Sequence, residues 1–294
     1  MKLGLGTAQF GLAYGITNEN GKVPDSEIAA ILRIARAQNV DAIDTAATYG
    51  TSEEALGRHL NIDDTFKIVT KTLPINQAVI EKREVQLVVE GFADSLKRLK
   101  RSKAYGLLVH SSKDLMAQNS EVLMAELHGL KRKGFVEKIG VSVYSGEEID
   151  RIIDRHEIDI IQLPINVFDQ RLIFSGHLDR LKSLGIEIHA RSAFLQGLLV
   201  VKPENLPEKF QKIRNLLAKY CSYLEQHGLT QIEGALTFLK QLGQIDCVIV
   251  GATSVANMIE ISSAFTKVQE GGLEFSHFAI SDKTVIDAAT WGET

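Results

Sequence analysis

The sequence predicts a single (β/α)8 barrel spanning residues 1–294, from two observations. Eight short apolar runs alternate with longer amphipathic segments along the chain, and no low-complexity linker or shift in composition divides them. The apolar residues in each run are successive rather than alternate and are rich in Val, Ile and Leu, as in parallel strands buried on both faces. Eight such strands, each followed by a helical segment, are typical of this barrel.

The expected strands are LGLGT (3–7), DAIDTA (41–46), FKIVTK (66–71), YGLLVH (105–110), KIGVSV (138–143), IDIIQL (158–163), IEIHAR (186–191) and DCVIVG (246–251). The expected helices include 25–39, capped by Asp25 or Ser26, and 82–100, 120–133, 146–155 and 205–227, the last ended by Gly228. A doubly wound sheet is the rival fold, and it needs a Gly-rich turn that leads directly into a helix. GLGTAQFG comes closest to such a turn, but we expect it to lead into a loop.

Composition excludes several functional classes. A formal net charge of -4 gives no basic surplus for nucleic-acid binding. Cys221 and Cys247 lack the spacing of a disulfide framework or a zinc finger, which suits a reducing cytoplasm. The first apolar run is broken by glycines, and no stretch approaches the ~20 apolar residues that span a bilayer. We therefore expect a cytoplasmic protein that acts on a small molecule, without nucleic-acid or membrane partners.

Polar residues and one glycine stand where the eight expected strands end. They are Thr7, Asp44, Lys71, His110, Ser142, Gln162, Ser192 and Gly251. In a barrel the carboxyl ends of all strands meet at one rim, where active sites are built. The sequence therefore predicts a polar site at this rim.

Four residues at this rim form a plausible proton-transfer unit: Asp44, Tyr49, Lys71 and His110. A tyrosine with a pKa of about 10 is a poor acid near neutrality, and an adjacent ammonium lowers that pKa. The carboxylate keeps the ammonium charged, and the imidazole orients a carbonyl or relays the proton. Taken singly, the residues also fit a structural ion pair, a buried histidine and a half-buried aromatic. Metal binding is disfavoured, because lysine is a poor ligand at neutral pH.

The segments GLGTAQFG, DTAATYGTSEEALG, the Lys of FKIVTK, the His of GLLVH, IGVS and VIVGATSVANMIE resemble the aldo-keto reductase family in order and spacing, over residues 3–265. The resemblance implies that Asp44, Tyr49, Lys71 and His110 are the catalytic tetrad, with Tyr49 as general acid. It also implies that NADP or NAD supplies the hydride.

The resemblance further implies a set of cofactor-binding positions. They are Gly6, Thr7, Ser142, Gln162, Arg191, Ser192, Gly251, Thr253, Ser254 and Asn257. Val143 replaces the usual Asn after the Ser, and Arg191 stands where an aromatic often stacks on the nicotinamide. No Lys or Arg occurs between 251 and 266 to meet a 2′-phosphate, so we expect weak discrimination between NADH and NADPH.

The leading hypothesis is thus an NAD(P)-dependent reductase of an aldehyde or ketone, including sugar-like carbonyls. One alternative is a slow-turnover regulatory or cofactor-sensing protein on the same fold. Another is an isomerase or lyase that uses Lys71 as a Schiff-base nucleophile. Tyr14, Tyr144 and Phe194 are candidate pocket residues, and the tail 267–294 either covers the site or caps the barrel. The motifs specify neither the substrate nor the oligomeric state.

Overall fold

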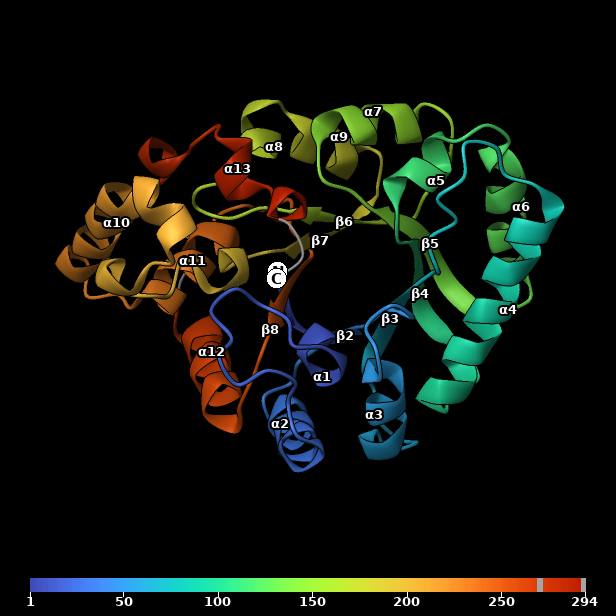
Figure 1. Ribbon diagram of the computed structural model, residues 1–294, viewed down its shortest axis with the longest axis horizontal. Helices are drawn as coiled ribbons and strands as arrows, with labels where there is room; N and C mark the ends of the chain where they lie inside the picture. Colours follow the sequence, from blue (N-terminus) through green and yellow to red (C-terminus); the bar gives the residue numbers. More distant parts are fainter. Residues whose placement is uncertain (269–271, 292–294) are drawn as a thin grey trace.

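Eight parallel strands close into a barrel in the computed structural model, which describes residues 1–268 and 272–291 (Figure 1). The strands are β1 Lys2–Gly6, β2 Ala42–Asp44, β3 Lys67–Lys71, β4 Ala104–Val109, β5 Val136–Ser142, β6 Ile160–Pro164, β7 Glu187–Arg191 and β8 Cys247–Gly251. They pair in sequence order, and β1 closes the barrel against β8. Each strand overlaps one expected run, so the predicted barrel is confirmed.

Helices surround the strands as an outer layer (Figure 1). They are α1 Ala8–Gly11, α2 Asp25–Ala37, α3 Ser52–His59, α4 Lys82–Leu99, α5 Ser112–Met116, α6 Ser120–Arg132, α7 Gly146–Ile153, α8 Arg171–Phe174, α9 His177–Ser183, α10 Arg214–Gln226, α11 Gln231–Lys240, α12 Val255–Lys267 and α13 Lys283–Ile286. The main core lies between this layer and the strands, where Val, Ile and Leu from both are buried.

Two helix predictions need correction. The expected helix 205–227 begins only at Arg214, after a 3-10 segment Glu208–Ile213, because Leu206 is held extended by the proline that follows it. Neither Asp25 nor Ser26 caps α2; Pro24 precedes the helix, and the Asp25 carboxylate instead pairs with Arg58. GLGTAQFG itself ends in one helical turn, α1, and the expected loop follows it from Leu12 to Pro24.

The C-terminal segment packs on the helical layer through its aromatic residues. Phe278 is buried, and its ring centroid lies 5.4 Å from that of Tyr220. The ring centroids of Trp291 and Phe210 are 4.8 Å apart. These contacts place the described part of the tail 267–294 against α10 and the segment before it. Residues 269–271 and 292–294 of that tail lie outside the described residues.

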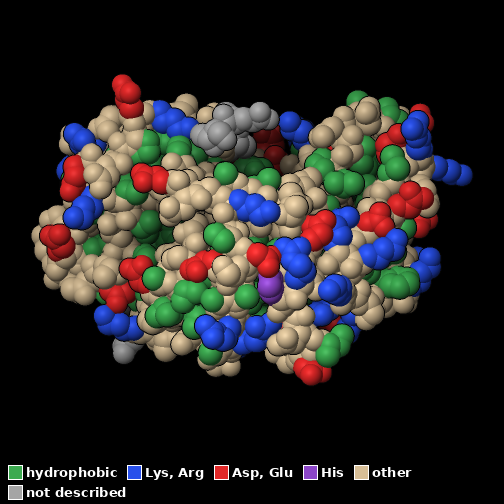
Figure 2. All heavy atoms as spheres, turned by 60° about the horizontal axis from the view of Figure 1, so that its bottom comes forward, with side chains coloured by type: hydrophobic (Ala, Val, Ile, Leu, Met, Phe, Trp, Pro, Cys, Tyr) green, Lys and Arg blue, Asp and Glu red, His purple; other side chains and the backbone are tan. Residues whose placement is uncertain are grey.

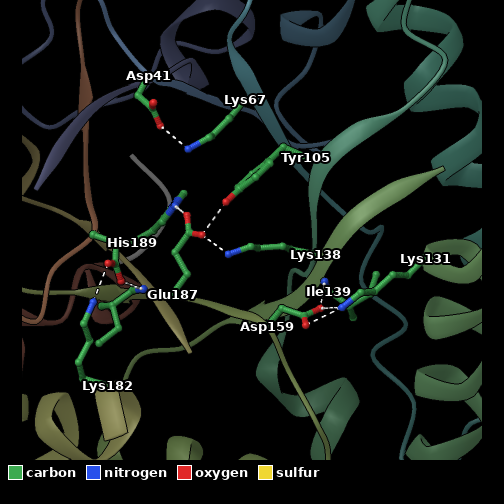
Figure 3. Close-up of polar contacts among 12 residues, drawn as sticks. Asp41, Lys67, Tyr105, Lys131, Lys138, Ile139, Asp159, Lys182, Glu187 and His189 are labelled. Atoms are coloured by element: carbon green, nitrogen blue, oxygen red, sulfur yellow. Dashed lines mark hydrogen bonds and ion pairs between the residues drawn. The ribbon is translucent and has the colours of Figure 1, made fainter. Parts of the chain in front are cut away.

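A polar layer fills the barrel at the amino ends of the strands (Figure 3). The Glu187 carboxylate accepts hydrogen bonds from Tyr105 Oη at 2.6 Å and from Lys138 Nζ, and it lies 2.7 Å from His189 Nε2. Lys67 pairs with Asp41 beside this cluster at 3.1 Å. Glu187 therefore links β4, β5 and β7 at the end of the barrel opposite to Asp44 and Lys71.

Basic and acidic side chains are interspersed on the face of the molecule in Figure 2, and no field of one sign covers that face. This distribution agrees with the small net charge of -4. Within residues 1–268 and 272–291, no helix is long and apolar enough to cross a membrane.

The Glu187 cluster predicts a pH-dependent contribution to stability. Burial opposes ionisation of Glu187, but hydrogen bonds from His189, Lys138 and Tyr105 outweigh it and hold the pKa of this carboxyl well below its usual range. A lowered folded-state pKa stabilises the fold above the unfolded-state pKa of about 4.3, and this contribution is lost as the pH falls below that value. Glu187→Gln is expected to lower the free energy of unfolding at pH 7 by about 3 kcal/mol, because Lys138 loses its partner.

Urea unfolding at pH 7 and at stepwise lower pH measures this effect. Glu137→Gln is the matched control, because Glu137 pairs with Lys103 at the exposed surface, where such a pair contributes less than about 1 kcal/mol. A difference between wild type and Glu187→Gln that does not narrow below pH 4 would contradict the assignment.

Candidate active site

A buried ion pair joins the carboxyl ends of β2 and β3. Lys71 Nζ donates to both carboxylate oxygens of Asp44, at 2.7 and 2.8 Å, and to the Thr45 carbonyl at 3.1 Å. The Lys71 side chain is 1% exposed, so water cannot compete for these bonds. Gln162 Nε2 donates to the same carboxylate at 2.7 Å from β6. The pair is therefore fixed by three strands.

Tyr49 lies over this pair, and the loop after β2 positions it. Its hydroxyl is 3.3 Å from Lys71 Nζ, and the ammonium lies 4.9 Å from the ring centroid. The Tyr49 N–H bonds to the Ala46 carbonyl, and the Ser52 N–H bonds to the Tyr49 carbonyl, both at 3.0 Å. These bonds form the tight turn that aims the phenol at Lys71.

α1 packs directly against this turn. A Cβ at Gly11 would collide with the Tyr49 carbonyl oxygen, so only glycine allows so close an approach. The hydroxyl of Ser52 donates to the Thr7 carbonyl at 2.9 Å and lies 3.1 Å from Thr45 Oγ1. Contacts from β1 and α1 therefore hold the Tyr49 turn in place.

The segment that follows the Tyr49 turn anchors α3 to its neighbours. Glu53 is buried and accepts hydrogen bonds from Thr70 at 2.6 Å and from Arg98 at 2.8 Å, which links α3 to β3 and α4. A Cβ at Gly57 would collide with the Arg98 carbonyl, so this glycine lets α3 lie close to α4. Glu53 and Gly57 therefore support the loop that carries Tyr49 rather than reaching the site.

His110 follows β4 beside Tyr49. Its ring is edge-on to the Tyr49 ring, with centroids 6.0 Å apart, and its Nδ1 lies 3.1 Å from Thr48 Oγ1. Burial and the nearby Lys71 ammonium lower the pKa of His110 to about 4. The imidazole is therefore neutral at physiological pH.

The protonation states of Tyr49 and Lys71 follow from burial and from the ion pair with Asp44. Burial raises the pKa of Tyr49 and outweighs the opposing effect of Lys71, so the expected lowering of this pKa is wrong for the free protein. Burial lowers the pKa of Lys71, but the Asp44 carboxylate and Tyr49 raise it by a larger amount. The pKa of Lys71 therefore lies above its ordinary value. Tyr49 is thus a protonated phenol beside a charged ammonium, and a charged, paired lysine is a weak nucleophile.

A cavity of about 460 Å³ extends from Tyr49 toward the start of α12. At one end lie Asp44, Tyr49, Gln162 and Arg191, and at the other lie Thr253 and Asn257. Its volume is in the range of small-molecule and cofactor sites. Of the expected cofactor positions, those that line it are Gly6, Thr7, Gln162, Arg191, Ser192, Gly251, Thr253 and Asn257. Tyr14 and Phe194 line it as well.

Several expected residues lie elsewhere. Ser142 is buried beside Gln162 in the β5–β6 register and does not line the cavity. Ser254 caps α12, because its Oγ accepts the Asn257 N–H at 3.1 Å. Val143, in place of the usual Asn, is fully buried. Tyr144 does not line the cavity, but its ring packs on Arg191, whose guanidinium carbon lies 4.1 Å from the ring centroid.

Tyr14 and Phe194 were expected from the loops after β1 and β7, but other residues of these two loops that line the cavity were not expected from the sequence. Thr17, Asn18, Glu19 and Asn20 line it from the segment after α1, and Gln196 and Gly197 line it from the segment after β7. The two loops meet where Thr17 Oγ1 donates to the Gln196 carbonyl at 3.3 Å. The Gly and Asn content of residues 15–21 was the available signal, since it indicates an irregular loop next to the rim.

Among the described residues that line the cavity at the start of α12, none is basic. Ser254 and Thr253 offer hydroxyl groups, whereas the first helical N–H, that of Val255, is bound by the Glu27 carboxylate of α2 at 2.6 Å. Lys267, at the other end of α12, pairs with Glu233 at 2.6 Å. In the described part of the chain, no group of three or more His, Cys, Asp or Glu residues is arranged to hold a metal ion.

Comparisons with known proteins agree with this geometry. A model described as "Aldo/keto reductase family" matches residues 2–270. The chain is similar to aldo-keto reductase YhdN of Bacillus subtilis (strain 168), with 29% identity over 180 residues, or 58% of this chain. The matched stretch spans about half, 52%, of the length of this curated relative.

Solved structures share the fold. An aldo-keto reductase AKR11C1 from Bacillus halodurans in its holo form has a TM-score of 0.74 at 17% identity, covering 94% of this chain and 90% of that chain. The glycerol dehydrogenase AKR11B4 from Gluconobacter oxydans has a TM-score of 0.71 at 21% identity, with coverages of 91% and 87%. At such identities the likeness concerns the fold alone.

The environment of His110 predicts its titration. With its pKa lowered to about 4 by burial and by Lys71, the ring is expected to remain neutral from pH 8 down to about pH 5. Long-range ¹H–¹⁵N NMR correlations of the histidine rings measure this directly, and a His110→Gln variant identifies the signal. An imidazolium at His110 at pH 7 would contradict the structure.

Proposed function

The chain belongs to the aldo/keto reductase family and is an oxidoreductase, and we propose that it reduces an aldehyde or ketone with Tyr49 as general acid. The observation that carries this proposal is the buried contact of Tyr49 with Lys71, whose ammonium lies 3.3 Å from the phenol oxygen. The phenol, the ammonium and the neutral His110 imidazole converge beside one cavity. A carbonyl oxygen bound there meets a proton donor and a polar neighbour together.

The cavity suits a nicotinamide dinucleotide. It extends from Asp44 and Tyr49, the two tetrad residues that line it, to Thr253 and Asn257 at the start of α12, where the helix dipole favours a phosphate. A Cβ at Gly251 would lie 2.7 Å from the Gln9 amide and would narrow this end of the cavity. Gly6, Thr7, Ser192, Thr253 and Asn257 are the residues that would hold the dinucleotide. When bound, NAD(P)H supplies the hydride.

Each tetrad residue has a separate task in the proposed reaction. Tyr49 donates its proton to the carbonyl oxygen as the alcohol forms, and solvent returns the proton afterwards. Lys71 stabilises the resulting phenolate across the 3.3 Å contact, while Asp44 keeps Lys71 charged and in place. The neutral His110 hydrogen-bonds the carbonyl oxygen and orients it. In the reverse direction the Tyr49 phenolate is the base.

Removing the phenol hydroxyl tests the general acid. Tyr49→Phe is expected to lower carbonyl reduction by about 10²–10⁴-fold while cofactor affinity stays nearly unchanged. Lys71→Met acts in the same direction, and the double variant loses far less than the product of the single losses, because the two residues act as one unit. Cofactor oxidation over a panel of aldehydes, ketones and sugars measures the rates. More than half the wild-type rate in Tyr49→Phe would contradict the assignment of Tyr49 as the general acid.

We also propose that the site discriminates weakly between NADH and NADPH. A 2′-phosphate at the start of α12 would meet hydroxyl groups and the nearby Glu27 carboxylate instead of a Lys or Arg. A charge-assisted hydrogen bond contributes about 1.5–3 kcal/mol against about 1 kcal/mol for a neutral one, so the missing cation reduces NADPH preference by roughly tenfold.

Fluorescence titration with both cofactors tests this selectivity. NADH is expected to bind within about tenfold of NADPH, and Thr253→Lys is expected to shift the ratio toward NADPH. Thr253→Gln is the matched control, because it lengthens the side chain without adding charge. A wild-type preference for NADPH above a hundredfold would show that another residue supplies the positive charge.

A further inference from the structure

The side chain of Glu27 joins the first turns of two neighbouring helices, α2 and α12. These helices pack against each other and lie side by side in Figure 1. Glu27 belongs to the first turn of α2, and its Oε1 accepts the N–H of Val255, the first residue of α12, at 2.6 Å. Val255 stands in the chain between Thr253 and Asn257, which both line the cavity. A carboxylate is therefore fixed at the end of α12 that adjoins the cavity.

Acceptors from the protein already occupy N–H groups at the start of α12. The first N–H groups of a helix have no acceptor within the helix, and they are the donors that bind phosphate at helix ends. Here Glu27 accepts the Val255 N–H, and Ser254 Oγ accepts the Asn257 N–H at 3.1 Å. A carboxylate oxygen thus takes a donor that a phosphate oxygen would otherwise use.

The negative charge of Glu27 has no cationic partner in the described part of the chain. Arg58, which contacts α2, pairs with Asp25, and Lys267, at the far end of α12, pairs with Glu233. Glu27 is half-buried, so salt screens its charge less than that of an exposed side chain. The positive ends of the two helix dipoles stabilise the carboxylate instead. The start of α12 therefore carries a negative charge that a second anion would meet.

We propose that Glu27 determines the cofactor selectivity of the cavity, because its carboxylate repels the 2′-phosphate of NADPH at the start of α12 and leaves the uncharged ribose hydroxyl of NADH unopposed. Glu27 does not line the cavity, so it acts through its charge and through the helix end rather than by contact with the ribose. Like charges placed together are a source of specificity, since they disfavour the wrong ligand. A missing cation only withholds attraction, whereas Glu27 adds repulsion. The inference rests on the proposed dinucleotide binding, since it names the residue that selects between the two cofactors.

Fluorescence titration of the purified full chain with NADH and NADPH tests the role of Glu27. Glu27→Gln keeps an oxygen that can accept the Val255 N–H and removes the charge. It is expected to tighten NADPH binding by about tenfold and to change NADH binding by less than about twofold. Asp25→Asn is the matched control, because it removes a carboxylate from the same turn of α2, but one that is paired with Arg58. The control should leave the ratio of the two affinities unchanged.

The dependence on salt separates repulsion from a structural effect of the substitution. The gain in Glu27→Gln is expected to shrink between ionic strengths of about 0.1 M and about 1 M, where the Debye length falls from about 10 Å to about 3 Å. A ratio of affinities that is unchanged in Glu27→Gln would overturn the proposal. Equal losses of NADH and NADPH affinity would overturn it too, and would show that Glu27 only caps α12.

Calorimetric titration with 2′,5′-ADP and 5′-AMP separates this inference from the proposed reaction, because the two fragments differ only by the 2′-phosphate and need no turnover. Glu27→Gln and Glu27→Ala are each expected to improve the affinity for 2′,5′-ADP relative to 5′-AMP by about tenfold. Such a result in a protein that reduces no carbonyl would refute the reductase function and still support Glu27 as the selecting residue.

Two other results of this titration would overturn the proposal. One is a gain in Glu19→Gln, whose carboxylate lines the cavity, without a gain in Glu27→Gln, which would assign the selection to Glu19. The other is an absence of binding by both fragments and both dinucleotides, which would overturn the proposed cofactor as well.

Discussion

The buried ion pair between Lys71 and Asp44 is the interaction on which the site depends. An ammonium that is 1% exposed persists only with a close counter-charge, and the two Asp44 oxygens at 2.7 and 2.8 Å supply it. Because the residues end neighbouring strands, the barrel fixes their separation before any ligand arrives. Tyr49 then needs only a short turn to reach the ammonium. The strand register thus positions the ion pair, and a short hydrogen-bonded turn after β2 positions the Tyr49 phenol over it.

The tetrad was predictable from the sequence because its geometry follows from strand order. Asp44, Lys71 and His110 end or follow β2, β3 and β4, so the apolar runs alone place them at one rim. The rest of the cavity lining was less predictable, because it depends on contacts between distant segments. Thr17 meets Gln196 across 179 residues, and no local pattern encodes that pairing. Ser254 illustrates the same limit, since its hydroxyl serves the helix end instead of the cavity.

The pKa of Tyr49 also depends on burial, which the sequence does not reveal. The spacing of Tyr49 and Lys71 suggested a lowered phenol pKa, but burial of the ring has the larger effect and raises it. This outcome suits the general-acid role proposed for Tyr49, because in that reaction the proton would remain on the phenol until the carbonyl oxygen can take it. The stabilising effect of Lys71 then matters after proton transfer, when the phenolate exists. The ammonium thus acts on the product of proton transfer more than on the resting phenol.

The two ends of the barrel use charge in different ways. At the amino ends of the strands, Glu187 has several hydrogen-bond partners, and the charges there compensate one another within the protein. At the carboxyl ends the Asp44–Lys71 pair is equally satisfied, whereas Arg191 has no carboxylate partner among the described residues and bonds to the Val143 carbonyl. An unpaired cation in a cavity costs desolvation energy that packing against Tyr144 offsets only in part. The first end therefore neutralises its charges among its own side chains, whereas the guanidinium at the second end faces the cavity, where a bound ligand would contact it.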